Sequence, residues 1–271
     1  MPLTEHQRRI LSVLASSRDD EGYLAGGAAL HFSPNSVRYS HDLDFFHDSS
    51  ERVASAYAGD RALLEAAGYG VDLVFSQPGF IRAIVSLGEK GTQIDWAHDS
   101  AWRFMPLVRN EVGGLLLHPV DLAVNKVLAL AGRDEARDFV DVLHVHRHIL
   151  PLGPLVWAAV GKDPGFSPPS LLEQIRRTGR FQPEEIDRLD LARPFDLREA
   201  KQEWLLALAE AEEFITQRPT EELGCLYYST EEGRFTGASP GEDLSAQGLV
   251  PHFGRPGGVL PRPTDMGFAV D

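Results

Sequence analysis

Hydrophobic and polar positions divide the chain into a first part that mixes strands with helices and a second part that is mainly helical. Residues 4–17 repeat apolar side chains at the spacing of an amphipathic helix. Residues 23–25 form a short apolar run that ends in Gly26-Gly27, which predicts a strand entering a tight turn. Residues 28–32 then predict a short helix. The same part predicts strands at 41–47, 71–76, 80–87 and 92–97, and a helix at 51–67.

Helical spacing replaces this mixture from residue 118 onward. Pro119 suits the first turn of a helix over 120–131, and Gly132 ends that helix. Further helices are predicted at 135–148, 152–160, 169–177 and 196–216.

A stretch rich in glycine and proline follows Pro219. Within it, residues 224–228 and 234–236 predict a small hairpin, and residues 237–271 predict an extended arm or a disordered tail. The predicted organisation is an α+β domain over 1–115, a helical domain over 116–218, and a C-terminal arm or tail over 219–271.

The composition is that of an ordinary globular protein, with 43% hydrophobic and 24% charged residues. Its single cysteine, Cys225, cannot form an intramolecular disulfide. The first nine residues are polar, and no apolar run approaches the ~18 residues that a membrane span needs. We therefore expect a soluble, cytoplasmic protein with no membrane association.

The net charge of −14 argues against a broadly basic nucleic-acid-binding protein. The acidic residues are unevenly placed, because residues 184–232 hold 14 acidic and 5 basic residues. Residues 1–183 hold 22 acidic and 18 basic residues. The first two thirds of the chain can therefore still present a local basic surface to a polyanion.

Asp42 and Asp44 alternate across Leu43 on a predicted strand. Both carboxylates then face the same side of the strand, about 6.5 Å apart along it. Carboxylate oxygens in this arrangement can share a hard cation such as Mg²⁺. A pair of this kind also arises by chance on surface strands, so its context matters.

Two features of the surrounding sequence strengthen the metal-site interpretation. Gly26-Gly27 follows a strand and opens a helix, where close backbone approach and free N–H groups suit a phosphate. Asp95 adds a third carboxylate from a separate strand, and a third carboxylate can accept a proton from an attacking hydroxyl. The alternative for Asp95 is a solvated acid at the end of a strand.

These residues resemble a nucleotidyltransferase signature. The sequences LAGGAAL at 24–30 and RYSHDLDFF at 38–46 are similar to blocks of the AbiEii/AbiGii-type toxin family, within the polymerase-beta-like nucleotidyltransferase superfamily. The later block KVLALAGRDEARDFVDV at 126–142 also resembles that family. The resemblance covers about residues 20–150. Ala28 stands where the family usually has threonine, so one hydroxyl contact to a phosphate is missing.

The resemblance implies a polymerase-beta-like nucleotidyltransferase fold, a short mixed sheet with flanking helices, followed by a helical domain that closes a cleft. It implies Mg²⁺ or Mn²⁺ as the cofactor. Asp138 is expected to be an acid/base group or to orient Lys126, which is expected to contact the triphosphate. The implied catalytic residues are Asp42, Asp44, Asp95 and Asp138; the implied metal ligands are Asp42, Asp44 and Asp95; the implied nucleotide contacts are Gly26, Gly27, Ser40, Lys126, Arg133 and Arg137.

Spacing alone favours a simpler interpretation of the later block, a helix pair stabilised by its own ion pairs. We retain that interpretation for Asp141. His144, His146 and His148 resemble a metal cluster, but histidines are common at helix C-termini because of the helix dipole. We therefore do not expect a metal there.

The expected activity is transfer of a nucleoside monophosphate from an NTP to a hydroxyl of an acceptor. The resemblance implies RNA or protein as the acceptor and a cognate antitoxin as a partner. Two alternatives stay open from the sequence: nucleotidylation of a small, aminoglycoside-like molecule, and a non-catalytic relative that binds a nucleotide or a partner.

Overall fold

A seven-stranded mixed sheet organises the first part of the chain. Its strands are β1 (Gly22–Ala25), β2 (Asp42–His47), β3 (Gly70–Gln77), β4 (Phe80–Leu87), β5 (Lys90–His98), β7 (Val108–Asn110) and β8 (Gly114–Leu116). They lie in the order β3-β4-β5-β2-β1-β8-β7. β2 runs parallel to β5 and β1 runs parallel to β8, whereas the other neighbours are antiparallel.

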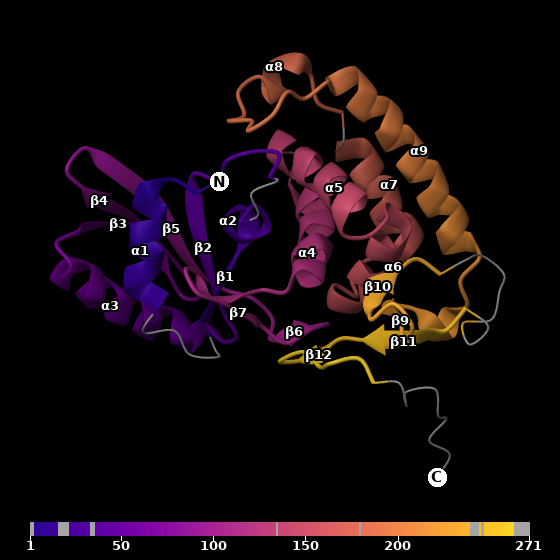
Figure 1. Cartoon of the computed structure of the whole chain (residues 1–271), viewed down its shortest axis with the longest axis horizontal. Coiled ribbons are helices and arrows are strands. Elements are labelled where there is room, and N and C mark those ends of the chain that lie inside the picture. The colour runs from indigo at the N-terminus through magenta and orange to yellow at the C-terminus, as the bar shows by residue number, and fades with distance from the viewer. Residues whose placement is uncertain are drawn as a thin grey trace, which may run out of the picture. The chain divides into compact units, whose positions relative to one another are not determined.

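The computed structural model describes residues 3–15, 22–32, 36–133, 135–178, 180–238, 244 and 247–262 (Figure 1). These residues fall into two compact units. The N-terminal unit comprises the described residues within 1–101, 106–122 and 190–193. The C-terminal unit comprises those within 102–105, 123–189 and 194–271.

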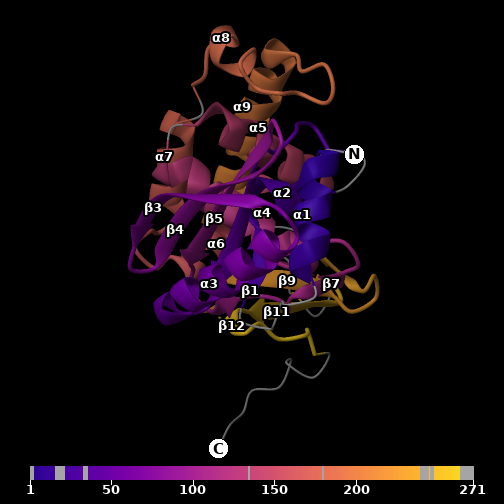
Figure 2. The same cartoon turned by 90° about the vertical axis from the view of Figure 1, so that its left-hand side faces the viewer.

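Side-chain alternation on β2 gives the central sheet an apolar face and a polar face. Leu43, Phe45 and His47 are buried, whereas the intervening residues are only partly covered. Trp96 of β5 lies beside Phe45, and its indole Nε1 donates to Asp60 Oδ2 at 2.7 Å. Asp60 belongs to α3 (Ser50–Ala66), which packs with α1 (Glu5–Ala15) on this face (Figure 2). The helices therefore leave the side chains of Asp42 and Asp44 on the other face.

The C-terminal unit is mainly helical, as its periodicity predicts. It contains most of α4 (Pro119–Gly132), and all of α5 (Ala136–His148), α6 (Leu152–Lys162), α7 (Pro168–Thr178), α8 (Pro183–Ile186) and α9 (Leu197–Thr216). Phe139 of α5 contacts the rings of Phe181 and Trp204, which forms an aromatic centre for this unit. α6 and α7 both pack against α9. No helix among the described residues combines the length and the apolar character that a bilayer span requires.

The strands that follow the one-turn helix η1 (Thr220–Glu222) in sequence belong to two small sheets. β9 (Cys225–Ser229) lies between β10 (Arg234–Thr236) and β11 (Leu249–Phe253). β12 (Arg255–Pro256) pairs with β6 (Trp102–Arg103). The expected hairpin is present. Within the expected arm or tail, residues 249–253 and 255–256 form the paired strands β11 and β12. The rest of that expectation falls partly on 239–243, 245–246 and 263–271, which lie outside the described residues.

The predicted α+β class is confirmed by the mixed sheet and its flanking helices. The predicted strands and helices recur with bounds shifted by a few residues at most. The short strands β6, β7, β8, β11 and β12 were not predicted, because two to five residues carry too little periodicity to mark a strand.

Candidate active site

The glycine turn after β1 lies directly against one carboxylate of the aspartate pair. Ala25 at the end of β1 pairs with Asp44 of β2, and α2 (Gly26–Leu30) begins at the next residue. Gly26 has φ +61°, and a Cβ built on it would lie 1.9 Å from Asp44 Oδ2. No side chain larger than glycine fits there while Asp44 keeps this position. The glycine that the sequence assigns to a phosphate therefore also shapes the carboxylate site.

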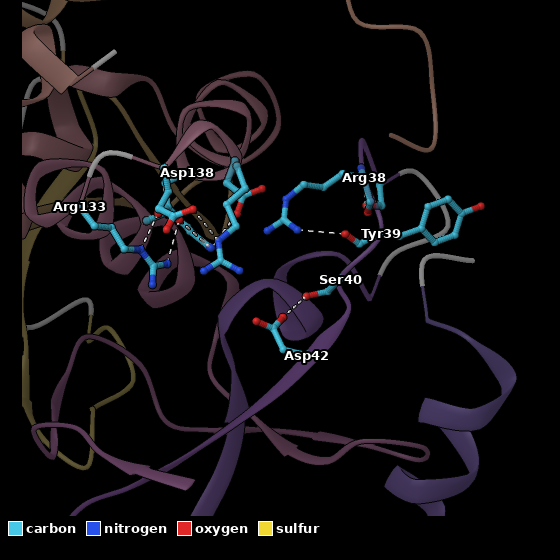
Figure 3. A network of polar contacts seen from close by, with 11 residues as sticks. Arg38, Tyr39, Ser40, Asp42, Arg133 and Asp138 are labelled. Carbon is cyan, nitrogen blue, oxygen red and sulfur yellow. Dashed lines mark hydrogen bonds and ion pairs between the residues drawn. The ribbon is translucent and has the colours of Figure 1, made fainter. Parts of the chain in front are cut away.

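The second glycine faces a serine and an arginine. A Cβ on Gly27 would lie 2.7 Å from Ser40 Oγ and 2.8 Å from Arg38 Nη2. Arg38 is buried, and its Nη1 donates to the Tyr39 carbonyl at 3.0 Å. Figure 3 shows this contact beside the Ser40–Asp42 hydrogen bond. Arg38 thus places a positive charge beside the turn, a contact that sequence reasoning did not assign to it.

Ser40 orients the first aspartate of the pair. Its hydroxyl donates to Asp42 Oδ1 at 2.9 Å (Figure 3). Its own carbonyl accepts a hydrogen bond from Gln7 Nε2 at 2.8 Å. Ser40 is buried, so this geometry is fixed from two sides. The expectation that Ser40 contacts nucleotide stays a prediction, because the shown partner of its hydroxyl is Asp42.

The segment that precedes β2 is paired with residues from much later in the chain. Tyr39 N donates to the Asp190 carbonyl at 2.8 Å, and Ala192 N donates to the Val37 carbonyl at 2.9 Å. Arg38 and Leu191 form an isolated antiparallel bridge. Residues 190–193 therefore belong to the N-terminal unit although the flanking residues belong to the other unit. No periodicity in the sequence signals this pairing.

Asp95 lies beside Asp44 in the sheet but is bound by an arginine. β5 pairs Asp95 with Asp44 of β2 on one side and with Arg82 of β4 on the other. Arg82 Nε donates to Asp95 Oδ1 at 2.8 Å, and Nη2 donates to Oδ2 at 2.6 Å. This hydrogen bonding, with the added charges of Asp95, Asp42 and Asp44, raises the pKa of Arg82 despite some desolvation. A charged residue inside the apolar run 80–87 is the sequence signal for Arg82.

The residues of the later block form a buried ionic cluster in the C-terminal unit. Lys126 Nζ lies 2.6 Å from Asp141 Oδ2 and 3.2 Å from Asp138 Oδ1. Arg133 makes a two-pronged contact with Asp138, with Nε–Oδ2 at 2.6 Å and Nη2–Oδ1 at 3.1 Å (Figure 3). Both aspartates are fully buried, whereas the Arg133 side chain is 48% exposed. Asp141, given only a structural role from sequence, makes the shortest contact of Lys126.

Two other predicted features have local partners. Arg137 forms an ion pair with Glu135, with Nε–Oε2 at 3.8 Å. His148 lies over His144 with ring centroids 4.5 Å apart, and His146 Nδ1 accepts a hydrogen bond from the Leu152 amide. Burial lowers the pKa of His146, against the opposing charges of two glutamates.

A divalent ion fits the donors that β2 presents. Asp42 and Asp44 offer carboxylate oxygens on one partly exposed face, and oxygen is the ligand type that Mg²⁺ prefers. Among the residues that the structure describes, no three Asp, Glu, His or Cys side chains are grouped as a metal site. Asp42 and Asp44 as metal ligands, and Asp95 as a third, stay predictions.

The sequence blocks and this geometry agree with a family comparison. The model of the family described as "Nucleotidyl transferase AbiEii toxin, Type IV TA system" matches residues 9–217. The chain belongs to the AbiEii family. It is therefore a nucleotidyltransferase of a toxin family, and the resemblance stated from its sequence is confirmed.

Several solved structures are similar to this AbiEii member. MenT4, a nucleotidyltransferase toxin from Mycobacterium tuberculosis H37Rv, matches with a TM-score of 0.54 and 20% identity, over 80% of this chain and 83% of MenT4. A putative nucleotidyltransferase from H. pylori has a TM-score of 0.48 and 17% identity, over 79% of this chain and 98% of that one. JHP933 from Helicobacter pylori has a TM-score of 0.47 and 18% identity, with coverage of 79% and 95%. No curated protein matches the chain.

Proposed function

We propose that this AbiEii member transfers a nucleoside monophosphate from an NTP to a hydroxyl of RNA or protein in a reaction that depends on Mg²⁺ or Mn²⁺. The observation that carries the proposal is the contact of Gly26 with Asp44, which joins a close-approach turn to the aspartate pair. A turn of this kind suits phosphate, and the pair suits the cation that accompanies a triphosphate. A ligand that contains both a phosphate and a bound divalent cation, such as an NTP with its metal, would use the turn and the aspartate pair together.

The aspartate pair is assigned to the metal. Asp42 is held by Ser40 and Asp44 is held against Gly26, so both carboxylates are preorganised before any ligand arrives. A divalent ion bound there supplies positive charge against the triphosphate and the departing pyrophosphate. Preorganised charge of this kind is the main source of catalysis in phosphoryl transfer.

The turn is assigned to the phosphates. Ala25 at the start of α2 has no side-chain oxygen that caps the first N–H groups. Gly27 lets Ser40 Oγ and Arg38 Nη2 approach its backbone more closely than a side chain there would allow. The backbone of this turn can then donate to a phosphate while Arg38 adds charge beside it.

The buried cluster is assigned to nucleotide binding on the basis of the family blocks. Lys126 and Arg133 balance the charges of Asp138 and Asp141. Arg133 is the half-exposed cation of this set, so it is the one that a phosphate in solution reaches first. Lys126 is held by Asp138 and Asp141, so its ammonium group is already fixed before a ligand binds. Arg137 is assigned to the same role from the family block alone. The structure gives it an ion pair with Glu135, with Nε–Oε2 at 3.8 Å.

In the proposed reaction the acceptor oxygen forms a bond to the α-phosphorus. The bond between that phosphorus and the bridging oxygen breaks, pyrophosphate leaves, and the hydroxyl proton passes to water. The chain's own groups bind and orient the triphosphate. We also propose that the reaction takes place in the cytoplasm, where NTPs are abundant, and that a cognate antitoxin restrains it.

Pyrophosphate release tests the acceptor class. Wild-type protein, Mg²⁺ and each NTP are incubated with total RNA, total protein or an aminoglycoside, and pyrophosphate is measured. Release that requires RNA or protein, and that Asp42→Asn removes, supports the proposal. Release with the aminoglycoside alone would contradict the macromolecular acceptor.

A further inference from the structure

Arg82 is held by Asp95 in a way that leaves much of its guanidinium unused. The contacts of Asp95 engage the Nε and Nη2 edge. Nη1 donates to no residue that the structure describes, and the Arg82 side chain is 37% exposed. Asp95, by contrast, is 8% exposed. A buried carboxylate thus fixes an arginine whose side chain is partly exposed.

The position of this arginine is set by strand pairing. Arg82, Asp95 and Asp44 occupy the same register on β4, β5 and β2. Paired residues of neighbouring strands face the same side of a sheet, so two strand spacings, about 10 Å, separate the backbones of Arg82 and Asp44. The charges of Asp42 and Asp44 both act on Arg82. The arginine therefore borders the aspartate pair on the polar face of the sheet.

The geometry disfavours Asp95 as a third metal ligand. Both of its oxygens accept hydrogen bonds from one guanidinium, at 2.8 and 2.6 Å. A divalent ion on the same oxygens would lie next to that fixed positive charge, with a strong like-charge repulsion at low dielectric. An arginine fork is instead well suited to bind an anion such as phosphate.

We propose that Arg82 binds an oxyanion of the nucleotide triphosphate, and that Asp95 is a positioning residue that holds Arg82 in place. This inference rests on the proposed function. It leaves Asp42 and Asp44 as the carboxylates of the metal site. It also separates two measurable properties, because the Arg82–Asp95 pair governs triphosphate affinity and the aspartate pair governs divalent-ion affinity.

Two binding titrations on the full chain test the separation. Mn²⁺ binding is followed by electron paramagnetic resonance, and binding of inorganic tripolyphosphate with Mg²⁺ is followed by calorimetry. The variants are Arg82→Lys and the double variant Arg82→Gln/Asp95→Asn, which removes the pair without changing the net charge. The matched control is Arg61→Gln/Glu65→Gln, which removes an exposed pair on α3 with an Nε–Oε1 distance of 2.7 Å.

We expect tripolyphosphate affinity to fall about 10- to 100-fold in the double variant, as for loss of a charge-assisted contact. Arg82→Lys keeps the charge without the fork and is expected to lose about tenfold. Mn²⁺ affinity is expected to stay within about threefold in both, and the α3 control is expected to behave as wild type. Arg82→Lys keeps a partner for the buried Asp95, so its tripolyphosphate affinity still tests the proposal if the double variant folds poorly.

Two results would overturn this inference and leave the proposed function intact. A loss of Mn²⁺ affinity in the double variant by more than about tenfold would make Asp95 a metal ligand. Unchanged tripolyphosphate affinity would mean that the Arg82–Asp95 pair only stabilises the pairing of β4 with β5. Asp44→Asn distinguishes the underlying proposal, because Mn²⁺ binding that survives this substitution would contradict both the metal site and the inference.

Discussion

Gly26→Ala tests whether the glycine turn shapes the carboxylate site. The added Cβ would lie 1.9 Å from Asp44 Oδ2 and 2.7 Å from its Cγ, so Asp44 must rotate away. A side chain driven off its rotamer costs about 0.5–1.5 kcal/mol. The positive φ of +61° adds about 1 kcal/mol for a residue with a Cβ. The total expected loss of unfolding free energy is therefore about 1.5–2.5 kcal/mol.

Gly68→Ala separates these two contributions. Gly68 has φ +87°, and a Cβ there would meet no atom within 4 Å. This variant should therefore lose only the backbone contribution of about 1 kcal/mol and should keep full activity. Gly26→Ala should in addition lose about 100-fold or more in transfer rate, because a displacement of about 1 Å in a positioning group costs that much.

The assay combines urea unfolding with Mn²⁺ titration and label transfer for both variants. Mn²⁺ affinity should fall in Gly26→Ala and stay unchanged in Gly68→Ala. Equal Mn²⁺ affinity and equal activity in the two variants would refute the reasoning, because the strain would then act on stability alone and Asp44 would not depend on the turn.

Three further predictions concern buried charges and the thiol. Lys126→Met should lower the unfolding free energy in urea by about 3–5 kcal/mol, because it removes the buried cation that contacts both Asp138 and Asp141; a loss below 1 kcal/mol would contradict this. Burial lowers the pKa of His118 to about 4, so its protonation favours the unfolded chain. The unfolding free energy should therefore decline as the pH falls from 6.5 to 4, by up to about 3 kcal/mol. His118→Asn can still accept the Val120 amide hydrogen bond. In urea titrations across this range, its unfolding free energy should depend less steeply on pH. Burial also raises the pKa of the Cys225 thiol to about 12, so a disulfide reagent at pH 8 should label it only after unfolding, and rapid labelling of native protein would show that the site opens.

Local sequence was sufficient for the parts of this molecule that depend on local physics. The alternation in residues 42–47 predicts both the strand and the shared face of its two aspartates. The glycine pair predicts the turn, and the structure adds that Gly26 is needed because Asp44 stands over it. These features depend on neighbouring residues and on the period of the strand, which a single sequence contains.

Features that depend on distant parts of the chain escaped prediction. Nothing in residues 190–193 indicates that they pair with residues 37–39, which precede β2. The register of β4 against β5, which brings Arg82 onto Asp95, is set by the tight turn between Leu87 and Lys90. The ion pair expected of Asp141 is present, as its contact with Lys126, but the complete burial of Asp141 was not predicted.

The most direct test of the central claim is transfer of label from each α-³²P-NTP into RNA and protein of a cell extract, with wild type and Asp44→Asn side by side. We predict label in one class of macromolecule, dependent on Mg²⁺ or Mn²⁺ and absent with Asp44→Asn. Transfer that persists with Asp44→Asn, or no transfer by a wild-type protein that binds NTP and metal, would contradict the account.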